Sequence, residues 1–335
     1  MAQRLVLVVV ALLAFSSASL MAQQRGPAAP QGVREATVTA IPGVVAAGAT
    51  WKLAWQGTDN ADGLVGTTGG AVLFAQEQPN RVSRLDRNDR VSVFLTDTHG
   101  TGSLAIDAKG RIFSVQRTCT DPGRSSAAGP CLEPTKVGVL APDRRVLADN
   151  FEGKPLGRLN DLVVDKKGGA YFTSGGAYYA KPSGQVISLG GDIRANGIML
   201  SRDEKVVYVT NGGVILAFDV QPDGAVTNRR DFGKLEAGGS GDGLAIDAAG
   251  RLYVTSAPGV QLLSPEGNYL GVIPTPRSVI SVAFAGPDKK TLYVVGSGAL
   301  GPDGKEFVTP EGVRNNAKTI YKIPMLAQGF KGRSK

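Results

Sequence analysis

Apolar and polar residues alternate along this chain in short runs separated by turns, and one run recurs. Between Asp242 and Thr255, an Asp-Gly turn leads into an alternating apolar segment, a turn ending at Gly250, and a second apolar segment. Alternation over a few residues, bounded by glycine turns, predicts two paired β-strands. The unit is therefore a β-hairpin.

Six copies of this hairpin follow one another. Most of them recur at the spacing of about 40–45 residues that is typical of a four-stranded propeller blade. A β-sandwich also has many short strands, but it does not require six copies of one hairpin at this period. We therefore predict an all-β fold, a six-bladed β-propeller with four-stranded blades around a central metal-binding channel. The first large apolar residues of the copies are Leu64, Leu104, Leu162, Ile198, Leu244 and Val282.

The longest interval, from Leu104 to Leu162, contains a Pro-, Gly- and Ser-rich stretch between Thr118 and Thr135. We interpret this stretch as a loop insertion. The 45 glycines and 19 prolines of the 335 residues suit a chain with many tight turns, and 42% hydrophobic residues are enough for a sizeable core.

The N-terminus has the order of a secretory signal peptide: Arg4, an apolar run, and small residues up to Ala22. An uncleaved anchor is the alternative, but the run is too short for an ordinary membrane-spanning helix. We expect cleavage after Ala22 and a periplasmic or secreted protein. The predicted organisation is a signal peptide (1–22), a linker with a possible ring-closing strand (23–50), the propeller (51–325) and a basic tail (326–335).

Cys119 and Cys131 both lie in the predicted insertion. In an oxidising compartment they would form one local disulfide, and two unpaired thiols are the alternative. Two cysteines and the single histidine, His99, argue against a zinc site built from nitrogen and sulfur ligands. Any metal is therefore expected to have oxygen ligands.

The net charge of +8 raises the question of nucleic-acid binding. A nucleic-acid groove concentrates basic residues on one face with interleaved aromatics. Here they are dispersed, so we expect a solvated basic surface and no nucleic-acid partner. We also expect no stable membrane insertion after signal cleavage, and a monomer. The basic groups are Arg144-Arg145, Lys166-Lys167, Arg229-Arg230, Lys289-Lys290 and the tail from Lys331 to Lys335.

The innermost strands of a propeller line its channel, so equivalent positions converge at one end of the axis. Two residues before each large apolar residue, the chain has two carboxylates, two amides, one glycine and one isoleucine. Carboxylate and amide oxygens suit a hard divalent cation such as Ca²⁺, with Mg²⁺, Mn²⁺ or Zn²⁺ as alternatives. The six positions are Asp62, Gly102, Asn160, Asn196, Asp242 and Ile280. We predict Asp62, Asn160, Asn196 and Asp242 as metal ligands.

The alternative is that these residues only form turns, because Asp-Gly and Asn-Gly are common turn dipeptides. Their shared register favours the metal site. Other Asp-Gly turns, at Asp223 and Asp303, are expected between blades, and Asn160 is followed by Asp161 instead of glycine.

Three runs, at 158–165, 195–198 and 241–247, resemble motifs of the SMP-30/gluconolactonase/LRE family of six-bladed propellers, and the similarity extends over roughly Trp51 to Val295. The resemblance implies a divalent-metal-dependent hydrolase, usually of sugar lactones. It matches Asn196 and Asp242 with metal ligands, Asn160 with an asparagine that approaches metal or substrate, and Arg158 with an arginine that holds substrate oxygens.

The first blade departs from the family pattern. The family has a Glu in a Glu-Gly-Pro motif, whereas this chain has Asp62 followed by Gly63 and Leu64. The shorter side chain requires the cation to shift or to bind through water. Glu77 is the other carboxylate considered in this blade, but its place after the second strand makes it a poorer candidate.

A mechanism follows from the resemblance. The cation would polarise the lactone carbonyl, and Asp242 would orient or deprotonate the attacking water. Arg158 would bind substrate oxygens. Tyr178 and Tyr179 are expected in a loop, as part of a lid or as surface aromatics. His99 is a candidate substrate contact or a simple turn residue.

Two alternatives remain open on the sequence. One is a non-enzymatic propeller binding module with a structural cation. The other is a related propeller esterase or phosphotriesterase, since a fold does not fix an activity.

Overall fold

The computed structural model describes residues 32–117, 133–307, 319–333 and 335. The chain divides into two compact units, Met1–Pro30 and Gln31–Lys335, and the fold reported is that of the second unit. The predicted signal peptide, Cys119, Cys131 and most of the predicted insertion lie outside the described residues. No helix in the part of the chain that is described has the length and apolar character to cross a membrane.

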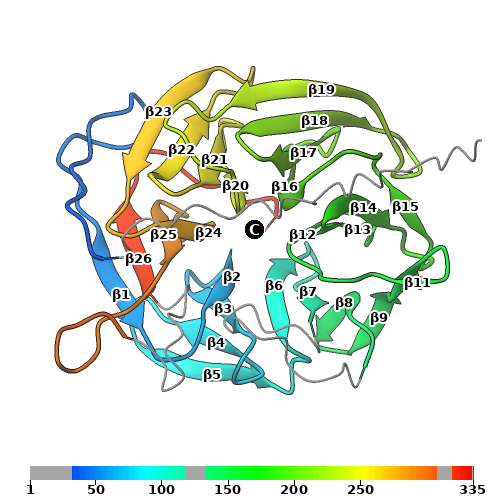
Figure 1. Ribbon diagram of the computed structural model, residues 1–335, viewed down its shortest axis with the longest axis horizontal. Coiled ribbons are helices and arrows are strands. Elements are labelled where there is room, and N and C mark those ends of the chain that lie inside the picture. Colours follow the sequence, from blue (N-terminus) through cyan, green and yellow to red (C-terminus); the bar gives the residue numbers. More distant parts are fainter. Residues whose placement is uncertain (1–31, 118–132, 308–318, 334) are drawn as a thin grey trace, which may run out of the picture. The chain divides into compact units, whose positions relative to one another are not determined.

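Six four-stranded antiparallel sheets are arranged around a ring (Figure 1). The prediction of an all-β, six-bladed propeller is confirmed. Blade one contains β2 (Asp62–Gly66), β3 (Val72–Gln76), β4 (Arg81–Leu85) and β5 (Val91–Thr96). Blade two contains β6 (Thr101–Ile106), β7 (Ile112–Gln116), β8 (Lys136–Ala141) and β9 (Arg145–Ala148). Blade three contains β12 (Leu162–Val164), β13 (Ala170–Ser174), β14 (Gly176–Ala180) and β15 (Val186–Ser188).

The second half of the ring repeats this order. Blade four contains β16 (Ala195–Leu200), β17 (Val206–Asn211), β18 (Val214–Val220) and β19 (Val226–Lys234). Blade five contains β20 (Leu244–Ile246), β21 (Leu252–Thr255), β22 (Gly259–Leu263) and β23 (Tyr269–Pro274). Blade six contains β24 (Val279–Ala285), β25 (Thr291–Gly296), β26 (Thr319–Pro324) and β1 (Lys52–Gln56). A small hairpin of β10 (Asn150–Phe151) and β11 (Lys154–Pro155) lies between blades two and three in the chain.

The innermost strand of each blade begins within two residues of the predicted repeat position. All six large apolar residues that define the repeat lie in these strands and are buried. The expectation that Asp223 and Asp303 lie between blades is wrong. Asp223 lies between β18 and β19 of blade four, and Asp303 lies between β25 and β26 of blade six.

In blades two, three and five, the turn that joins the first two strands is specified by an aspartate. In blade five, Asp247 Oδ1 accepts the backbone N–H groups of Ala249 and Arg251, each at 2.9 Å. Gly250 takes a φ of 90°, which only glycine adopts readily. Asp107 and Asp165 accept backbone N–H groups in the same way in blades two and three. The repeated Asp and Gly therefore fix the strand register locally.

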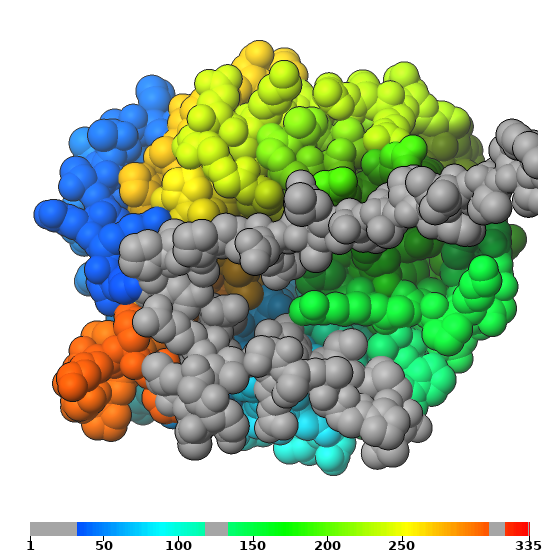
Figure 2. All heavy atoms as spheres, viewed as in Figure 1, coloured from blue at the N-terminus to red at the C-terminus, as the bar shows by residue number. Residues whose placement is uncertain are grey.

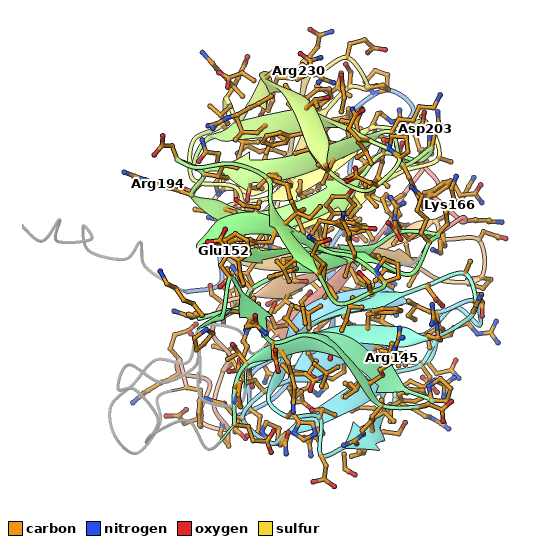
Figure 3. All side chains as sticks on the ribbon, turned by 90° about the vertical axis from the view of Figure 1, so that its right-hand side faces the viewer. Arg145, Glu152, Lys166, Arg194, Asp203 and Arg230 are labelled. Carbon is orange, nitrogen blue, oxygen red and sulfur yellow. The ribbon has the colours of Figure 1, made fainter. Side chains whose placement is uncertain are left out.

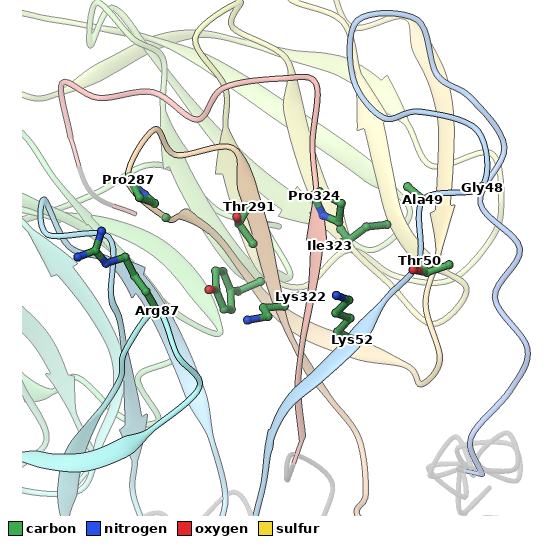
Figure 4. A pocket seen from close by; sticks show the side chains of 12 residues that line it. Gly48, Ala49, Thr50, Lys52, Arg87, Pro287, Thr291, Lys322, Ile323 and Pro324 are labelled. Carbon is green, nitrogen blue, oxygen red and sulfur yellow. The ribbon is translucent and has the colours of Figure 1, made fainter.

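The ring closes in blade six, where β1 pairs with β26 and joins the start of the described chain to its end. Figure 2 shows the blue residues of the early chain beside the orange residues of the late chain. Trp51 Nε1 donates to Pro274 O at 2.6 Å, and Arg34 Nε donates to Thr275 O at 2.7 Å. A cavity of about 610 Å³ lies at this seam, and its lining includes Lys52 and Lys322 (Figure 4).

Charged side chains are spread over the outside of the blades. Figure 3 shows Arg145, Lys166, Arg194 and Arg230 at separate places on the molecule. The basic pair at 289–290 differs from this pattern because Lys289 is buried.

The segment after β26 packs against the propeller. Lys289 Nζ donates to Phe330 O at 3.0 Å and to Arg333 O at 3.1 Å. Arg333 is buried and lies 3.7 Å from Glu204, while Lys335 reaches the central channel. The expectation that the basic tail is simply a solvated surface is therefore wrong for Arg333 and Lys335.

Candidate functional site

Four side chains predicted from the repeat converge in the channel. Asn160 Nδ2 donates to Asn196 Oδ1, and the Asn196 side chain hydrogen-bonds to Asp242. Asp62, Asn160 and Asp242 line one cavity of about 20 Å³, which has room for about one water molecule or ion. Blades one, three, four and five thus each bring one polar group to the same place.

Threonines of the second strands fix Asn196. Thr173 Oγ1 of blade three donates to Asn196 O at 2.5 Å, across the boundary to blade four. Thr210 Oγ1 of blade four accepts the N–H groups of Asn196 and Gly197, at 3.3 and 2.8 Å. Because both hydroxyls are held in strands, the backbone that carries the Asn196 amide has little freedom to move.

Arg117, which follows β7, is a site residue that the sequence analysis did not identify. Its side chain is 2% exposed. Nη1 lies 3.1 Å from Glu77 Oε2 and 3.5 Å from Asp62 Oδ2, and Nη2 donates to Asn160 Oδ1 at 2.9 Å. The guanidinium therefore joins blade one to blade three beside the cavity.

Glu77, the poorer candidate on its place after the second strand, lies beside Arg117 in the structure. Glu77 follows β3 directly, just as Arg117 follows β7. The two residues occupy the same repeat position, and each is preceded by a glutamine, Gln76 and Gln116. Extending the repeat to the end of the second strand would have found both.

Asp161, next to Asn160, organises the inner end of the cavity. Its Oδ1 accepts Ser103 Oγ at 2.7 Å and the N–H of Leu162 at 2.9 Å, and its Oδ2 accepts the N–H of Ile198 at 3.1 Å. Lys335 Nζ forms an ion pair with Oδ2. Asp161 thus ties blades two, three and four together, and Lys335 supplies it with a counter-charge.

Burial makes the carboxylates hard to ionise. It raises the pKa of Asp62, although Arg117 and the N–H of Gly63 oppose this. Burial, together with the neighbouring charges of Asp62 and Asp161, holds the pKa of Asp242 well above its usual range. Asp62, Glu77, Asp161 and Asp242 face the cations Arg117 and Lys335. If all were ionised, four negative charges against two positive ones would leave an excess of two.

This donor set fits a hard divalent cation. Two carboxylates and two amides offer only oxygen ligands, and a charge of +2 would balance the excess. No group of three or more His, Cys, Asp or Glu side chains in the described ranges has the arrangement of a metal site. The fit therefore depends on the asparagine oxygens as much as on the carboxylates.

The other predicted site residues lie apart from this cluster. Arg158 is exposed, two residues before Asn160. His99 lies in a turn at a φ of 54°, with Nδ1 at 3.3 Å from Glu133 Oε2. The expectation of a loop at Tyr178 and Tyr179 is wrong because both lie in β14, where Tyr178 stacks on Phe172 with ring centroids 5.4 Å apart.

The sequence model of the SMP-30/gluconolactonase/LRE-like region matches residues 131–298. The chain belongs to this family. Within the SMP-30/gluconolactonase/LRE-like family, the chain is 30% identical to a gluconolactonase of Zymomonas mobilis over 193 residues, which are 48% of this chain and 54% of that protein. It is 29% identical to the pentonolactonase XacC of Haloferax volcanii over 210 residues, 58% of this chain and 71% of that protein. The chain thus spans about half the length of the Zymomonas relative.

Solved structures show the same fold at lower identity. A gluconolactonase of Xanthomonas campestris superposes with a TM-score of 0.67 at 22% identity, covering 89% of this chain and 98% of that one. A calcium-binding regucalcin of Agrobacterium tumefaciens superposes with a TM-score of 0.58 at 17% identity, covering 79% and 91%. At these identities the likeness supports the propeller and says nothing of the site.

Proposed function

We propose that the protein is a divalent-metal-dependent hydrolase that opens a sugar lactone, with Ca²⁺ as the preferred cation. The observation that carries this proposal is the convergence of Asp62, Asn160 and Asp242 on one small cavity, with the Asn196 amide hydrogen-bonded to Asn160 and Asp242. The names of the relatives, a gluconolactonase and a pentonolactonase, support a lactone as the substrate.

Asp62, Asn160, Asn196 and Asp242 would hold the cation, which when bound supplies Lewis-acid polarisation of the lactone carbonyl. A divalent ion would balance the excess of two negative charges that the cluster has when all four carboxylates are ionised. The calcium-binding regucalcin of the same fold is consistent with Ca²⁺, and Mg²⁺, Mn²⁺ and Zn²⁺ remain to be compared.

Asp242 is the base in this proposal. Its carboxylate borders the cavity, so it can accept a proton from a water molecule placed there. Asn196 hydrogen-bonds to the carboxylate and thereby orients it.

Arg158 is proposed to bind substrate oxygens from the rim of the channel. Its guanidinium is exposed, and its carbonyl accepts Ser174 Oγ at 3.1 Å, which anchors the backbone beside Asn160. An exposed arginine two residues before Asn160 offers the forked donors that recognise hydroxyl or carboxyl oxygens. The roles predicted for His99 and Tyr178 as substrate contacts remain predictions.

The test is a panel of aldonolactones, homoserine lactones and phosphotriesters, assayed with Ca²⁺, Mg²⁺, Mn²⁺, Zn²⁺ or EDTA. We expect hydrolysis of an aldonolactone that EDTA abolishes and one cation restores.

Asp242→Asn should lower kcat by about 10²–10⁴, the range for loss of a general base. Asp223→Asn, in an exposed turn, is the matched control and should leave kcat unchanged.

Inactivity on every substrate with every cation would contradict the enzyme proposal, above all if Asp242→Asn bound cations as tightly as the wild type. Cation binding without turnover would favour a binding module with a structural cation. Turnover of phosphotriesters alone would favour the related phosphotriesterase.

We also propose export, on the basis of residues 1–22. Cell fractionation of the full chain should place it outside the cytoplasm, and deletion of residues 2–22 should retain it inside. Equal distribution of both forms would contradict export.

A further inference from the structure

We propose that Arg117 is a positioning residue that orients Asn160 and, through Asn160, the Asn196 amide that hydrogen-bonds to Asp242. The proposal starts from the place of the guanidinium. It is almost fully buried and lies at the junction of blades one, two and three. It contacts Asp62 and Asn160, two of the four convergent residues, directly.

The guanidinium plane is fixed on two edges. Nε donates to Leu159 O at 2.7 Å, and Nη2 donates to Asn160 O at 2.8 Å. On the opposite edge, Nη1 faces Glu77 and Asp62. A planar fork held in this way cannot rotate without losing several charge-assisted hydrogen bonds at once.

The fixed guanidinium selects one orientation of the Asn160 amide. Because Nη2 donates to Asn160 Oδ1 at 2.9 Å, the NH₂ group of Asn160 must point the other way. There it donates to Asn196 Oδ1, which in turn directs the Asn196 NH₂ group to the Asp242 carboxylate. Donors and acceptors therefore run in one direction, from Arg117 through two amides to Asp242.

The hydrogen bonds that run from Arg117 to Asp242 depend on one another. Each amide can donate only from its nitrogen and accept only at its oxygen, so the orientation of one amide determines the next. Hydrogen bonds in series also polarise one another in a buried setting. The consequence, which rests on the proposed function, is that a residue remote from Asp242 sets the direction in which that base is held.

The proposal is tested by NMR, through the side-chain NH₂ signals of Asn160 and Asn196. In protein labelled with ¹⁵N-asparagine and kept in EDTA, the side-chain NH₂ signals are assigned by their loss in Asn160→Asp and Asn196→Asp. We expect Arg117→Met to shift both signals and to accelerate their exchange with water at least about tenfold, as expected when buried hydrogen bonds open. Arg117→Lys keeps the charge without the fork, so both effects should be smaller.

Arg277→Met is the matched control. Arg277 is also fully buried and paired with a carboxylate, Glu306 at 2.8 Å, but it belongs to another part of the ring. Its loss should destabilise the fold without moving either amide signal. Should Arg117→Met fail to fold, Arg117→Gln replaces it, since glutamine lacks the charge but retains a donor.

An unmoved Asn196 signal in Arg117→Met would overturn the proposal, as would equal shifts in Arg277→Met. On a lactone that the wild type hydrolyses, Arg117→Met should reduce kcat more than it changes KM. If the wild type hydrolyses no lactone, the proposed function fails, and the amide signals still decide the role of Arg117.

Discussion

At the scale of single residues, the site depends on close approach between blades. Gly197 in β16 lies against the backbone of blade five, where an added Cβ would meet Asp242 O at 2.0 Å and Asp242 C at 3.0 Å. Backbone atoms cannot move aside for an added Cβ in the way that the end of a flexible side chain can. The absence of a side chain at Gly197 thus sets the distance between Asn196 and Asp242.

We therefore expect Gly197→Ala to destabilise the protein by about 1–3 kcal/mol, the usual cost of overpacking, and to weaken cation binding. The comparison is Gly213→Ala, whose Cβ would meet its nearest atom, Gly239 O, at an ordinary 3.6 Å. Urea unfolding and calorimetric titration with Ca²⁺ measure the two effects. Similar losses in both variants would contradict a specific role for Gly197.

Site residues are easiest to predict from the sequence when they occupy an equivalent position in several repeats. Asp62, Asn160, Asn196 and Asp242 are predictable because each occupies the same repeat position, at or just before the start of an inner strand. Arg117 was missed because its blade has glycine at that position and contributes its side chain from the end of the second strand instead. A repeat compared at one position cannot reveal a group supplied from another.

At the scale of elements, the segment after β26 is bound by the ammonium group of Lys289, whose charged form is disfavoured by burial. Lys289 donates to two carbonyls of this segment, while burial, Arg333 and Lys331 lower the pKa of Lys289 to about 8. The unfolded chain keeps the ordinary value of 10.5. Between these two values the unfolded state binds more protons, so stability should rise with pH.

The expected gain between pH 8 and 10.5 is at most roughly 3 kcal/mol for this group. Lys289→Met should lose that part of the pH dependence, whereas Lys290→Met, an exposed neighbour, should retain it. Unfolding free energies of the three proteins at several pH values provide the measurement. Parallel curves for wild type and Lys289→Met would contradict the assignment.

Sequence patterns predict elements by local signals and miss those set by distant contacts. The hairpin turn that ends at Gly250 is predicted correctly because its hydrogen bonds, from Ala249 and Arg251 to Asp247, are local. The sequence favours a loop at Tyr178 and Tyr179, but the chain reverses at Gly175 and pairs as β14 with β13. Lys335 lies after the last strand and outside the repeat, so the repeat cannot predict its ion pair with Asp161.

At the scale of the whole molecule, the ring is closed by non-covalent pairing of β1 with β26. The segment before β1 adds four buried side chains, Val38, Ile41, Val44 and Val45. At about 1.5–3 kcal/mol for each such side chain, this segment contributes more than about 5 kcal/mol.

Deletion of residues 1–57 should therefore lower Tm by more than about 10 °C and promote association through the exposed edge of β26. Deletion of residues 1–31 keeps β1 and Arg34 and serves as the control. Calorimetry and size-exclusion chromatography measure both outcomes. Equal Tm values and a monomeric profile for both deletions would contradict this account of closure.

Ring closure also has a consequence for biosynthesis. The partner of Gln56 is Thr319, so β1 leaves the ribosome long before its partner strand exists. At about 5–20 residues per second, the delay is on the order of tens of seconds. During this time β1 presents an unpaired edge that includes the apolar Leu53. A premature stop codon just before β26 would therefore damage the beginning of the protein as well as its end.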